Sequence, residues 1–457
     1  MTAPATEVLR PAIPALGWGD RLRFAARLLR SGPADAFRWA HQRFGPTIRV
    51  GLPGRTLVSV TDPDDVERVT RSEFYKFGKG DIDADLVPMW GSNNVLSAHG
   101  DVWRAQRRAC QPVFAPTRAP VVQEIVVRHA RRLLDPLVDE AGHGPLRREL
   151  YQDLRRIVMS SCCEDWFGVT DPAEARRISD VLTRVSDVTT RLVARPVKIP
   201  RSVPTPLNLR YRARLRELDA VVAELIGRPT DRPDDLLGQM LRASGSVAPD
   251  QLRGNLVVFL VAAYETPSLG WALFLLGRHR EVAERAAAEV DSVLGGADPT
   301  VADLKRLVFL DACLLEALRL HPPSPVLFRE ALEDVQLATG RVEAGETVAI
   351  AACALHLDPL TWPDPDSYRP ERFLDRRTDG LSFLPFGTGP RACIGAAVAM
   401  QTKKTLVAML LQRFRFAVDD GYAPVPNDPL RPHPSGSVPA TLTLRPRSAR
   451  DGSPNVR

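Results

Sequence analysis

The chain has 457 residues, of which 44% are hydrophobic and 25% are charged. It is long enough to bury a large core, and it is too apolar for an intrinsically disordered chain. The formal net charge of +6 is small for this length and no run of five or six like charges occurs, so we expect no nucleic-acid partner.

The first half of the chain predicts many helices and one hairpin. Two amphipathic helices within residues 20–43 are separated by Ser31-Gly32-Pro33, and two short strands flank Pro53-Gly54. Residues 76–98 are rich in Gly, Asp and Asn, and residues 195–209 contain four prolines, so both are expected to be loops. Helical periodicity predicts helices at 101–111, 118–141, 146–166, 171–194 and 210–226.

The second half begins with helices and then changes character. Helical patterns cover 250–277, 279–294 and 303–320, whereas 335–355 predict paired short strands and 358–370 a proline-rich coil. A helix is expected at about 393–412, followed by closing strands at 414–418 and 440–444. The sequence therefore predicts a mainly α fold with a small β-sheet part and a long, kinked central helix. We expect one domain over residues 20–446, with tails at 1–19 and 447–457.

The cysteines and the start of the chain bear on its compartment. The six cysteines show neither CxxC spacing nor a Cys/His zinc pattern, and residues 1–19 contain no apolar leader. We therefore expect a cytoplasmic protein with reduced thiols. The most apolar stretch, Leu256–Leu276, is interrupted by Glu265, Thr266 and Pro267, so we expect a buried helix and no membrane anchor.

The strongest chemical motif is the segment 386–395, FGTGPRACIG. Cys393 stands where an irregular glycine-rich loop becomes a helix, and free N–H groups and the helix dipole at such a place stabilise a thiolate. Two glycines and a proline let the backbone pass close to something flat and bulky. A thiolate ligand of haem iron requires such a pocket. For a lone cysteine a buried structural role is more common, but the ten-residue pattern favours the haem ligand.

The same segment also matches the G-x-G-x-x-A dinucleotide-binding fingerprint. That fingerprint requires a buried strand immediately before it and an acidic residue about 20 residues after it. Residues 378–386 contain helix and strand breakers and no β-branched run, and Asp419 lies later than the expected place. A single match of this type is weak, so we favour the haem-thiolate interpretation.

Two further motifs place charged groups on helices. Glu316 and Arg319 are three residues apart and share one helix face, and the segment 370–373, PERF, lies between them and Cys393. Trp103 and Arg107 are four residues apart on another helix. Taken alone, the first motif is an ordinary surface ion pair and the second is a solvated basic helix.

The middle of the most apolar helix contains an acid and an alcohol. Glu265 and Thr266 follow Ala263 and precede Pro267. Burying such groups costs several kcal/mol unless they are paired or hydrated. Thr266 and Pro267 both favour a kink. A kinked and hydrated groove beside a metal is a route for protons, whereas a kinked core helix with its Glu in solvent is the alternative.

Together these residues resemble the cytochrome P-450 family of haem-thiolate monooxygenases, in its soluble bacterial form, over nearly the whole chain. The ExxR motif, the PERF-like segment and the cysteine loop follow the family's order and approximate spacing. The resemblance implies that Cys393 binds the iron and that Phe386, Gly387 and Gly395 shape its loop. It also implies a buried charge triad that locks this loop and supports haem incorporation, formed by Glu316, Arg319 and Arg372.

The resemblance implies roles for the remaining motif residues. Glu265 and Thr266 would deliver protons during dioxygen activation, although Ala263 stands where the family usually has Gly. His356 would pack or form hydrogen bonds. Four residues would meet the haem propionates, and Arg suits bidentate carboxylate contacts: Trp103, Arg107, Arg329 and Arg391.

The implied function is a monooxygenase that inserts one oxygen atom of dioxygen into an apolar small molecule, with haem b as cofactor. A terpenoid or polyketide-like compound of secondary metabolism is the expected substrate. Electrons would come from NAD(P)H through a ferredoxin reductase and a ferredoxin. Arg104, Arg108, Lys403 and Lys404 would form a basic face for this acidic partner, unless they are scattered solvated charges. A haem-thiolate isomerase or dehydratase and a non-catalytic haem sensor stay as alternatives, and the Glu265–Thr266 pair argues against both.

Overall fold

The computed structural model describes residues 13–52, 55–80, 87–193, 199–228, 235–242, 248–264, 267–374, 380–424, 434 and 438–445. The chain forms two compact units, each assembled from separate stretches of sequence. Unit 1 consists of Met1–Ala84, Arg319–Ser367 and Thr378–Cys393, and unit 2 of Asp85–Leu318, Tyr368–Arg377 and Ile394–Arg457. Most of the predicted N-terminal tail and all of the predicted C-terminal tail lie outside the described residues.

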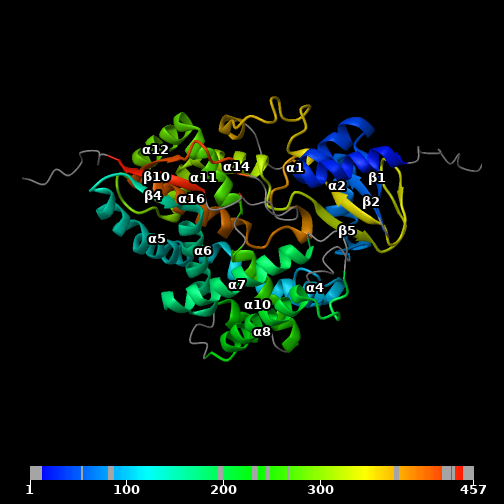
Figure 1. Ribbon diagram of the computed structural model, residues 1–457, viewed down its shortest axis with the longest axis horizontal. Coiled ribbons are helices and arrows are strands. Elements are labelled where there is room, and N and C mark those ends of the chain that lie inside the picture. Colours follow the sequence, from blue (N-terminus) through cyan, green and yellow to red (C-terminus); the bar gives the residue numbers. More distant parts are fainter. Residues whose placement is uncertain are drawn as a thin grey trace, which may run out of the picture. The chain divides into compact units, whose positions relative to one another are not determined.

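Unit 1 is built on a five-stranded sheet in the order β1-β2-β8-β5-β3 (Figure 1). The predicted hairpin is present, because β1 (Thr47–Leu52) pairs antiparallel with β2 (Arg55–Val60). β2 runs parallel to β8 (Thr347–Ile350), while β5 (Leu327–Ala331) pairs antiparallel with β8 and with β3 (Phe77–Gly78). The other elements of unit 1 are β6 (Val335–Gln336), β7 (Arg341–Val342), α1 (Trp18–Phe44), α2 (Pro63–Glu67), α15 (Ala352–Leu355), η1 (Arg68–Ser72), η2 (Phe74–Lys76) and η8 (Gly389–Arg391).

The sheet and the first helix share an apolar core. β-Branched residues suit a pleated, buried surface, and Val58, Val348 and Ile350 are fully buried. Phe24 and Phe37 of α1 join the cluster that includes residues of β1 and β2. At the predicted break in α1, Gly32 takes a φ of 83°, which a residue without a Cβ adopts readily.

Unit 2 is mainly helical (Figure 1). It also contains a three-stranded antiparallel sheet in the order β4-β10-β9, in which the two predicted closing strands pair with each other. Its strands are β4 (Leu146–Glu149), β9 (Phe414–Val418) and β10 (Pro439–Leu444). Its helices are α3 (Val87–Trp90), α4 (Gly100–Cys110), η4 (Gln111–Phe114), η5 (Pro116–Arg118), α5 (Ala119–Ala141), α6 (Leu150–Phe167), α7 (Pro172–Val193), α8 (Pro206–Ile226), α9 (Leu236–Arg242), α10 (Pro249–Tyr264), α11 (Pro267–Arg278), α12 (Arg280–Leu294), α13 (Val301–Arg306), η7 (Pro370–Phe373), α16 (Ala396–Arg413) and α14 (Val308–Leu320), which continues into unit 1 at Arg319.

The apolar central segment comprises α10 and α11, and the predicted kink at Glu265 and Thr266 lies outside the described residues. α10 contacts α3, α6, α7 and α8, and most of its residues are buried (Figure 1). Among the described residues, Pro249–Arg278 is the one segment long and apolar enough to cross a membrane, and 88% of its most apolar window is buried within the protein. The buried-helix prediction therefore agrees with the structure.

Several predicted elements were wrong in detail. Residues 76–98 are not one loop, because they contain β3 and α3. The predicted helix at 146–166 begins with strand β4, whose Leu-Arg-Arg-Glu sequence has no strand propensity and pairs with the distant β10. The predicted helix at 303–320 is two helices, since Leu307 takes a non-helical φ/ψ of −80° and 71° between α13 and α14.

Candidate functional site

The cysteine loop of unit 1 has an irregular backbone that is closed by its own hydrogen bonds. The Cys393 N–H donates to the Phe386 carbonyl at 2.8 Å, and the Gly387 N–H donates to Leu384 at 3.1 Å. The Ala392 N–H closes the short helix η8 by donating to Gly389 at 3.0 Å. These bonds fold the loop back on itself, so that Cys393 lies next to its first residue, Phe386.

Two glycines of the motif take backbone conformations that favour glycine. Gly387 and Gly389 have φ values of 68° and 70°, in the left-handed region. At Gly389 an added Cβ would also collide with the Thr70 carbonyl. The neighbouring Thr388 hydroxyl accepts two hydrogen bonds from the Arg71 guanidinium, at 2.8 and 2.9 Å. The loop is therefore seated closely on helix η1, a contact that the sequence alone did not indicate.

Cys393 differs from the other cysteines in its accessibility. It is the one cysteine of six that is exposed, and α16 begins three residues after it. Burial raises the pKa of the thiols of Cys110, Cys163 and Cys353 to about 12. Burial also raises the pKa of the Cys162 and Cys313 thiols. Thiols of this kind stay protonated at neutral pH, and a metal requires the thiolate. The structure therefore favours Cys393 as the cysteine that can bind iron.

The surroundings of Cys393 in unit 1 fit a haem. At Gly387 an added Cβ would lie 3.7 Å from the Leu327 side chain, so the loop passes close to the start of β5. Arg329 follows two residues later on the same face of that strand, is 9% exposed, and donates to the Phe328 carbonyl at 2.8 Å. Arg391 is half-buried within the loop itself. A soft thiolate, apolar side chains and two guanidinium groups form a suitable donor set for iron and propionates.

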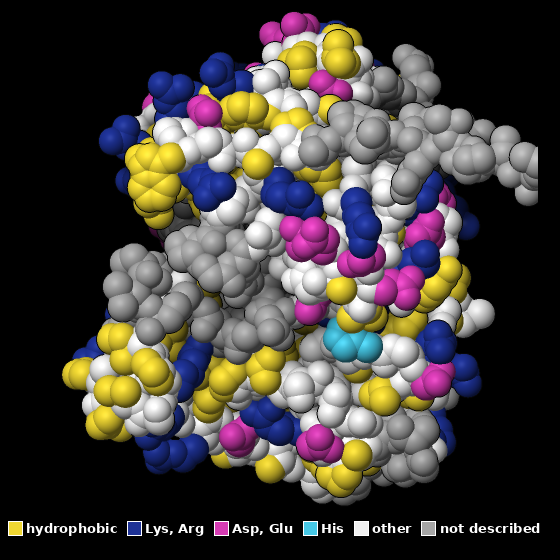
Figure 2. All heavy atoms as spheres, turned by 90° about the vertical axis from the view of Figure 1, so that its right-hand side faces the viewer, with side chains coloured by type: hydrophobic (Ala, Val, Ile, Leu, Met, Phe, Trp, Pro, Cys, Tyr) yellow, Lys and Arg dark blue, Asp and Glu magenta, His cyan; other side chains and the backbone are white. Residues whose placement is uncertain are grey.

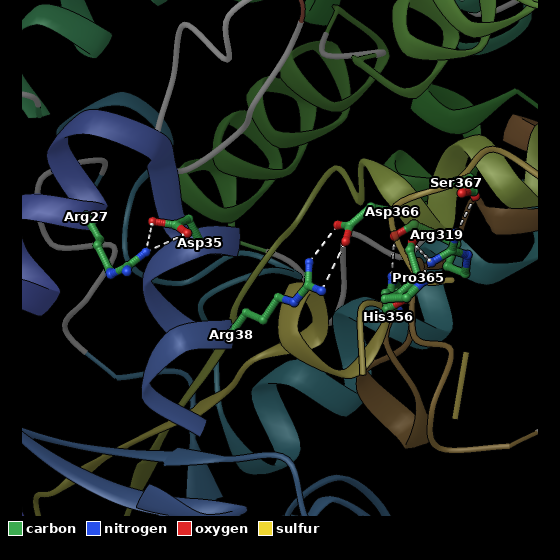
Figure 3. A network of polar contacts seen from close by, with 8 residues as sticks. All are labelled: Arg27, Asp35, Arg38, Arg319, His356, Pro365, Asp366 and Ser367. Atoms are coloured by element: carbon green, nitrogen blue, oxygen red, sulfur yellow. Dashed lines mark hydrogen bonds and ion pairs between the residues drawn. The ribbon is translucent and has the colours of Figure 1, made fainter. Parts of the chain in front are cut away.

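Arg319 of the predicted triad is fully buried and bonds to the coil that follows α15 (Figure 3). Its guanidinium donates to the carbonyls of His356, Pro365 and Ser367 at 2.8, 2.7 and 3.2 Å. It also lies 5.3 Å from the centre of the Trp362 ring. This single side chain therefore fastens both ends of the coil 356–367.

His356 continues this network to the cysteine loop. Its ring Nδ1 lies 3.2 Å from the Arg319 carbonyl, and its Nε2 accepts from the Leu384 N–H at 2.7 Å. Leu384 in turn accepts from Gly387 inside the loop. His356 is thus a buried hydrogen-bonding residue, in agreement with the role implied by the resemblance.

Glu316 lies in unit 2 and is also fully buried. Its Oε1 accepts from the Arg372 side chain at 3.3 Å and from the Arg369 N–H at 2.9 Å. These bonds fix helix η7, which holds the PERF segment. The Glu316–Arg372 pair therefore has the buried character expected of it, and its role in haem incorporation stays a prediction.

A second arginine holds the same coil of unit 1 from α1 (Figure 3). Arg38 forms a bidentate pair with Asp366, with N–O distances of 2.6 and 3.0 Å. Asp366 stands between Pro365 and Ser367, whose carbonyls accept from Arg319. Sequence reasoning missed Arg38, because 328 residues separate the partners and the motif has no local pattern.

The remaining predicted site residues lie in unit 2. Trp103 and Arg107 are one turn apart on α4, Trp103 buried and Arg107 half-buried. Gly395 caps α16, and an added Cβ there would lie 3.5 Å from Phe114, whose ring stacks on Phe259 of α10. The cysteine motif therefore ends against the apolar cluster that α10 crosses. Glu265 and Thr266 lie outside the described residues, in the two positions between α10 and α11.

The basic face suggested for a redox partner was partly wrong. Lys403 is 5% exposed, and its ammonium donates to the Ser268 hydroxyl at 2.8 Å in the interior of unit 2. Lys404 pairs with Asp311 at 2.6 Å and donates to the Leu304 carbonyl. Arg104 and Arg108 on α4 are exposed. The lysines of α16 therefore support the helix packing, and the arginines of α4 are the accessible cations of the set.

The dinucleotide-binding alternative disagrees with the structure. Residues 380–388 form turns and coil, and α16 follows them. No strand is present among these described residues, so the buried strand that the fingerprint requires is lacking.

Comparisons with known proteins agree with the haem-thiolate interpretation. The sequence matches the cytochrome P450 family over residues 19–440. It is 29% identical over 440 residues to a Mycobacterium tuberculosis protein named cytochrome P450 132, covering 87% of this chain and 88% of that one. It is 31% identical over 354 residues to the cyclooctat-9-en-7-ol 5-monooxygenase of Streptomyces melanosporofaciens, covering 74% and 76%.

The fold is similar to that of the solved structure of retinoic acid bound cyanobacterial CYP120A1. The TM-score is 0.77 at 22% identity, and the superposition covers 95% of this chain and all of that one. Because the family match spans most of the sequence and includes the loop of Cys393, the chain belongs to the cytochrome P450 family of haem-thiolate monooxygenases, enzymes with a haem cofactor.

Proposed function

We propose that the protein is a cytoplasmic haem b monooxygenase of secondary metabolism that oxygenates an apolar, medium-sized natural product such as a terpenoid or a polyketide-like molecule. The observation that carries this proposal is Cys393, the exposed cysteine in a loop whose glycines require left-handed φ values. The cofactor supplies oxygen activation when bound, and the protein positions substrate and protons.

The expected substrate class rests on the apolar cluster of unit 2. Met89 and Trp90 of α3 and Phe259 of α10 belong to one buried cluster, which also contains residues of α6, α7 and α8. Phe114, Trp166 and Phe259 form an aromatic group with ring centroids 5.5–6.0 Å apart. A chamber built in this surrounding favours an apolar ligand. The relative named for oxygenating cyclooctat-9-en-7-ol supports the same class.

The chain's own residues have distinct tasks in this proposal. The Cys393 thiolate would bind the iron, and the guanidinium groups of Arg329 and Arg391 would pair with the haem propionates. Arg107 of α4 would also pair with a propionate, and the Trp103 indole N–H would donate a hydrogen bond to one. Glu265 and Thr266, the two residues between α10 and α11, would pass protons from solvent toward the reacting oxygen, as an acid and a hydroxyl can.

Electrons come from NAD(P)H through a ferredoxin reductase and a ferredoxin. Arg104 and Arg108, which are exposed on α4, provide positive charge for an acidic protein. The face drawn in Figure 2 shows basic and acidic side chains interspersed, without a continuous basic patch.

Oxygen labelling tests this function. Purified haem-loaded protein is supplied with NADPH, a ferredoxin reductase, a ferredoxin and a panel of terpene and macrolactone substrates under ¹⁸O₂. A monooxygenase places one ¹⁸O atom in the product and needs both electrons and dioxygen. Turnover without electrons and dioxygen would instead identify a haem-thiolate isomerase or dehydratase, and binding of haem with no turnover of any substrate would favour a sensor.

A further inference from the structure

Three consecutive residues of α10 hold the same short segment of unit 2 by three different means. The Arg253 guanidinium donates to the Met89 carbonyl at 3.0 Å. At Gly254 an added Cβ would lie 2.5 Å from the Trp90 carbonyl, so the two backbones are in direct contact. The Asn255 amide accepts from the Val95 N–H at 2.7 Å. α3 and the loop after it are therefore fastened to the start of α10.

A second buried amide completes the attachment. The Asn255 Nδ2 donates to the Gln106 Oε1 at 2.8 Å, and the Gln106 Nε2 donates to the Asn93 carbonyl at 2.8 Å. Gln106 belongs to α4, so one network joins α10, α4 and the loop. Both amides donate and accept within the protein, and both are fully buried.

The loop is also braced from within. The Asn94 amide donates to the carbonyls of Trp90 and Gly91 at 3.0 and 2.9 Å. Its Oδ1 accepts from the N–H groups of Leu96 and Ser97 at 2.9 and 3.1 Å. This side chain replaces the backbone bonds that an irregular segment lacks, and it is fully buried as well.

The free-energy cost of breaking these buried hydrogen bonds stabilises the attachment of segment 87–98 to α10. A buried amide that loses its partner pays its full desolvation penalty, because water cannot replace the lost bond. In a low-dielectric interior the bonds of a connected network strengthen each other. If segment 87–98 moved away from α10, the Asn255 Oδ1, the Gln106 Nε2 and the Val95 N–H would lose their partners, so opening of this segment is disfavoured.

We propose that Asn255 is a specificity-determining positioning residue: it holds segment 87–98 as a fixed wall of the substrate chamber, so that Met89 and Trp90 keep constant places opposite Phe259. This inference rests on the proposed function in taking the apolar cluster as the substrate chamber. A fixed wall selects ligands by shape, whereas a mobile one adapts to many ligands. The enzyme therefore accepts a narrow range of ligand shapes on this side.

The test compares two buried amides of unit 2. Asn255→Leu keeps the volume and removes the bonds to Val95 and Gln106. Gln123→Leu is the matched control. Gln123 lies on α5, it is also buried, and its amide donates to the Pro299 carbonyl at 2.6 Å. Hydrogen–deuterium exchange of the 91–98 amides is expected to rise at least about tenfold in Asn255→Leu and to stay at the wild-type rate in Gln123→Leu.

Ligand binding supplies the second measurement. The probes are 1-alkylimidazoles from butyl to dodecyl and 1-phenylimidazole, whose binding to the haem iron is read from the Soret band. In Asn255→Leu the spread of dissociation constants across this series is expected to narrow about tenfold relative to wild type. An unchanged spread together with unchanged 91–98 exchange would overturn the inference, as would equal changes in Gln123→Leu.

A second variant covers the case in which Asn255→Leu does not fold. Gly254→Ala removes no hydrogen-bonding group, and its added Cβ pushes α3 away through the contact with the Trp90 carbonyl. It is expected to narrow the spread of dissociation constants in the same direction. If Gly254→Ala keeps the wild-type spread of dissociation constants, this contact does not fix the wall and the inference is wrong. None of these measurements uses turnover, so their failure is distinct from a failure of the proposed function.

Discussion

The side chains of Arg319 and His356 each form a hydrogen bond with the backbone carbonyl of the other residue. The Arg319 guanidinium donates to the His356 carbonyl at 2.8 Å, and the His356 ring Nδ1 lies 3.2 Å from the Arg319 carbonyl. Because a carbonyl only accepts, Nδ1 must hold the proton and Nε2 must accept from the Leu384 N–H. The ring is therefore neutral, with one tautomer set by its two neighbours, and it connects the buried arginine to the segment that enters the cysteine loop.

The first prediction concerns this connection. His356→Phe keeps the aromatic packing against Phe383, 5.2 Å between ring centroids, and removes both ring hydrogen bonds. An unpaired Leu384 N–H costs about 1–3 kcal/mol of folding free energy. The cysteine loop is therefore destabilised, and haem dissociates at least about tenfold faster. The measurement is haem transfer to apomyoglobin. His143→Phe is the control, because His143 is exposed, and an unchanged rate in His356→Phe would contradict the connection.

The second prediction concerns Arg319 itself. Arg319→Met removes three hydrogen bonds to buried carbonyls while it keeps most of the aliphatic volume. Loss of a buried charged partner costs roughly 3–5 kcal/mol, so the protein should be isolated with little or no haem. The ratio of Soret to protein absorbance gives the haem content. Arg38→Met breaks a partly exposed pair with Asp366 and is expected to retain most of its haem.

The third prediction concerns the iron ligand. The reduced carbon monoxide complex of the wild type should show the strongly red-shifted Soret band of thiolate ligation, and Cys393→Ser should lose it. Separate Ser or Ala replacements of the buried Cys110, Cys313 and Cys353 should keep the band, because burial holds these groups as thiols. Retention of the band in Cys393→Ser would show that another residue binds the iron.

The sequence predicted the helices well because their signal is local. The 3.6-residue periodicity of α5, α7 and α12, and the Pro-Gly turn between β1 and β2, are contained within each segment. The motif around Cys393 was equally local. It was therefore possible to predict the fold class from the order of residues alone, whereas the assignment of Cys393 as the metal ligand stays a prediction.

The parts that could not be predicted depend on distant partners. Arg319 donates to three backbone carbonyls 37 to 48 residues further along the chain, and such bonds have no sequence signature. Lys403 was expected at the surface because Lys is rarely buried, and only the packing of α16 against α11 shows where its ammonium lies. The Asn255–Gln106 bond joins residues 149 positions apart, and no pattern in either helix indicates it.

The fourth prediction concerns acid stability. Burial lowers the pKa of His41 to about 4, against an opposing hydrogen bond to the Gly45 carbonyl, whereas the unfolded chain has a value near 6.5. Below about pH 6.5 His41 is therefore protonated in the unfolded state but stays neutral in the folded state. The free energy of unfolding consequently falls as the pH decreases toward about 4. The contribution to the slope is at most about 1.4 kcal/mol per pH unit.

Urea unfolding at pH 7.5, 6.0 and 5.0 measures this effect. His41→Gln retains hydrogen-bonding capacity toward Ser59, which lies 2.8 Å from the His41 ring, and does not titrate. Its free energy of unfolding should decrease less than that of the wild type between pH 7.5 and 5.0, because carboxylates shared by both proteins cancel in the difference. Parallel pH dependences in the two proteins would show that His41 titrates with an ordinary pKa.

The last prediction concerns proton delivery by Glu265 and Thr266, the two residues between α10 and α11. Pro267 at the start of α11 has no N–H to donate to a backbone carbonyl. The family resemblance implies that Glu265 and Thr266 deliver protons during dioxygen activation. Thr266→Ala should bind haem and substrate normally and still oxidise NADPH through the redox partner, but it should form less product and more peroxide. General acid assistance is typically worth about 10²–10⁴-fold, and a water that replaces the hydroxyl reduces the loss.

Product formed per NADPH oxidised is the measurement, and Ser268→Ala is the matched control. Ser268 also has a hydroxyl and lies two residues after Thr266, but that hydroxyl accepts from the buried Lys403 ammonium, so its removal should lower stability and leave the ratio near the wild-type value. Equal ratios in wild type and Thr266→Ala would exclude the hydroxyl from proton delivery. An equal fall in both variants would show that the ratio reports the packing of the central helical segment, because only one of the two hydroxyls is assigned to the relay.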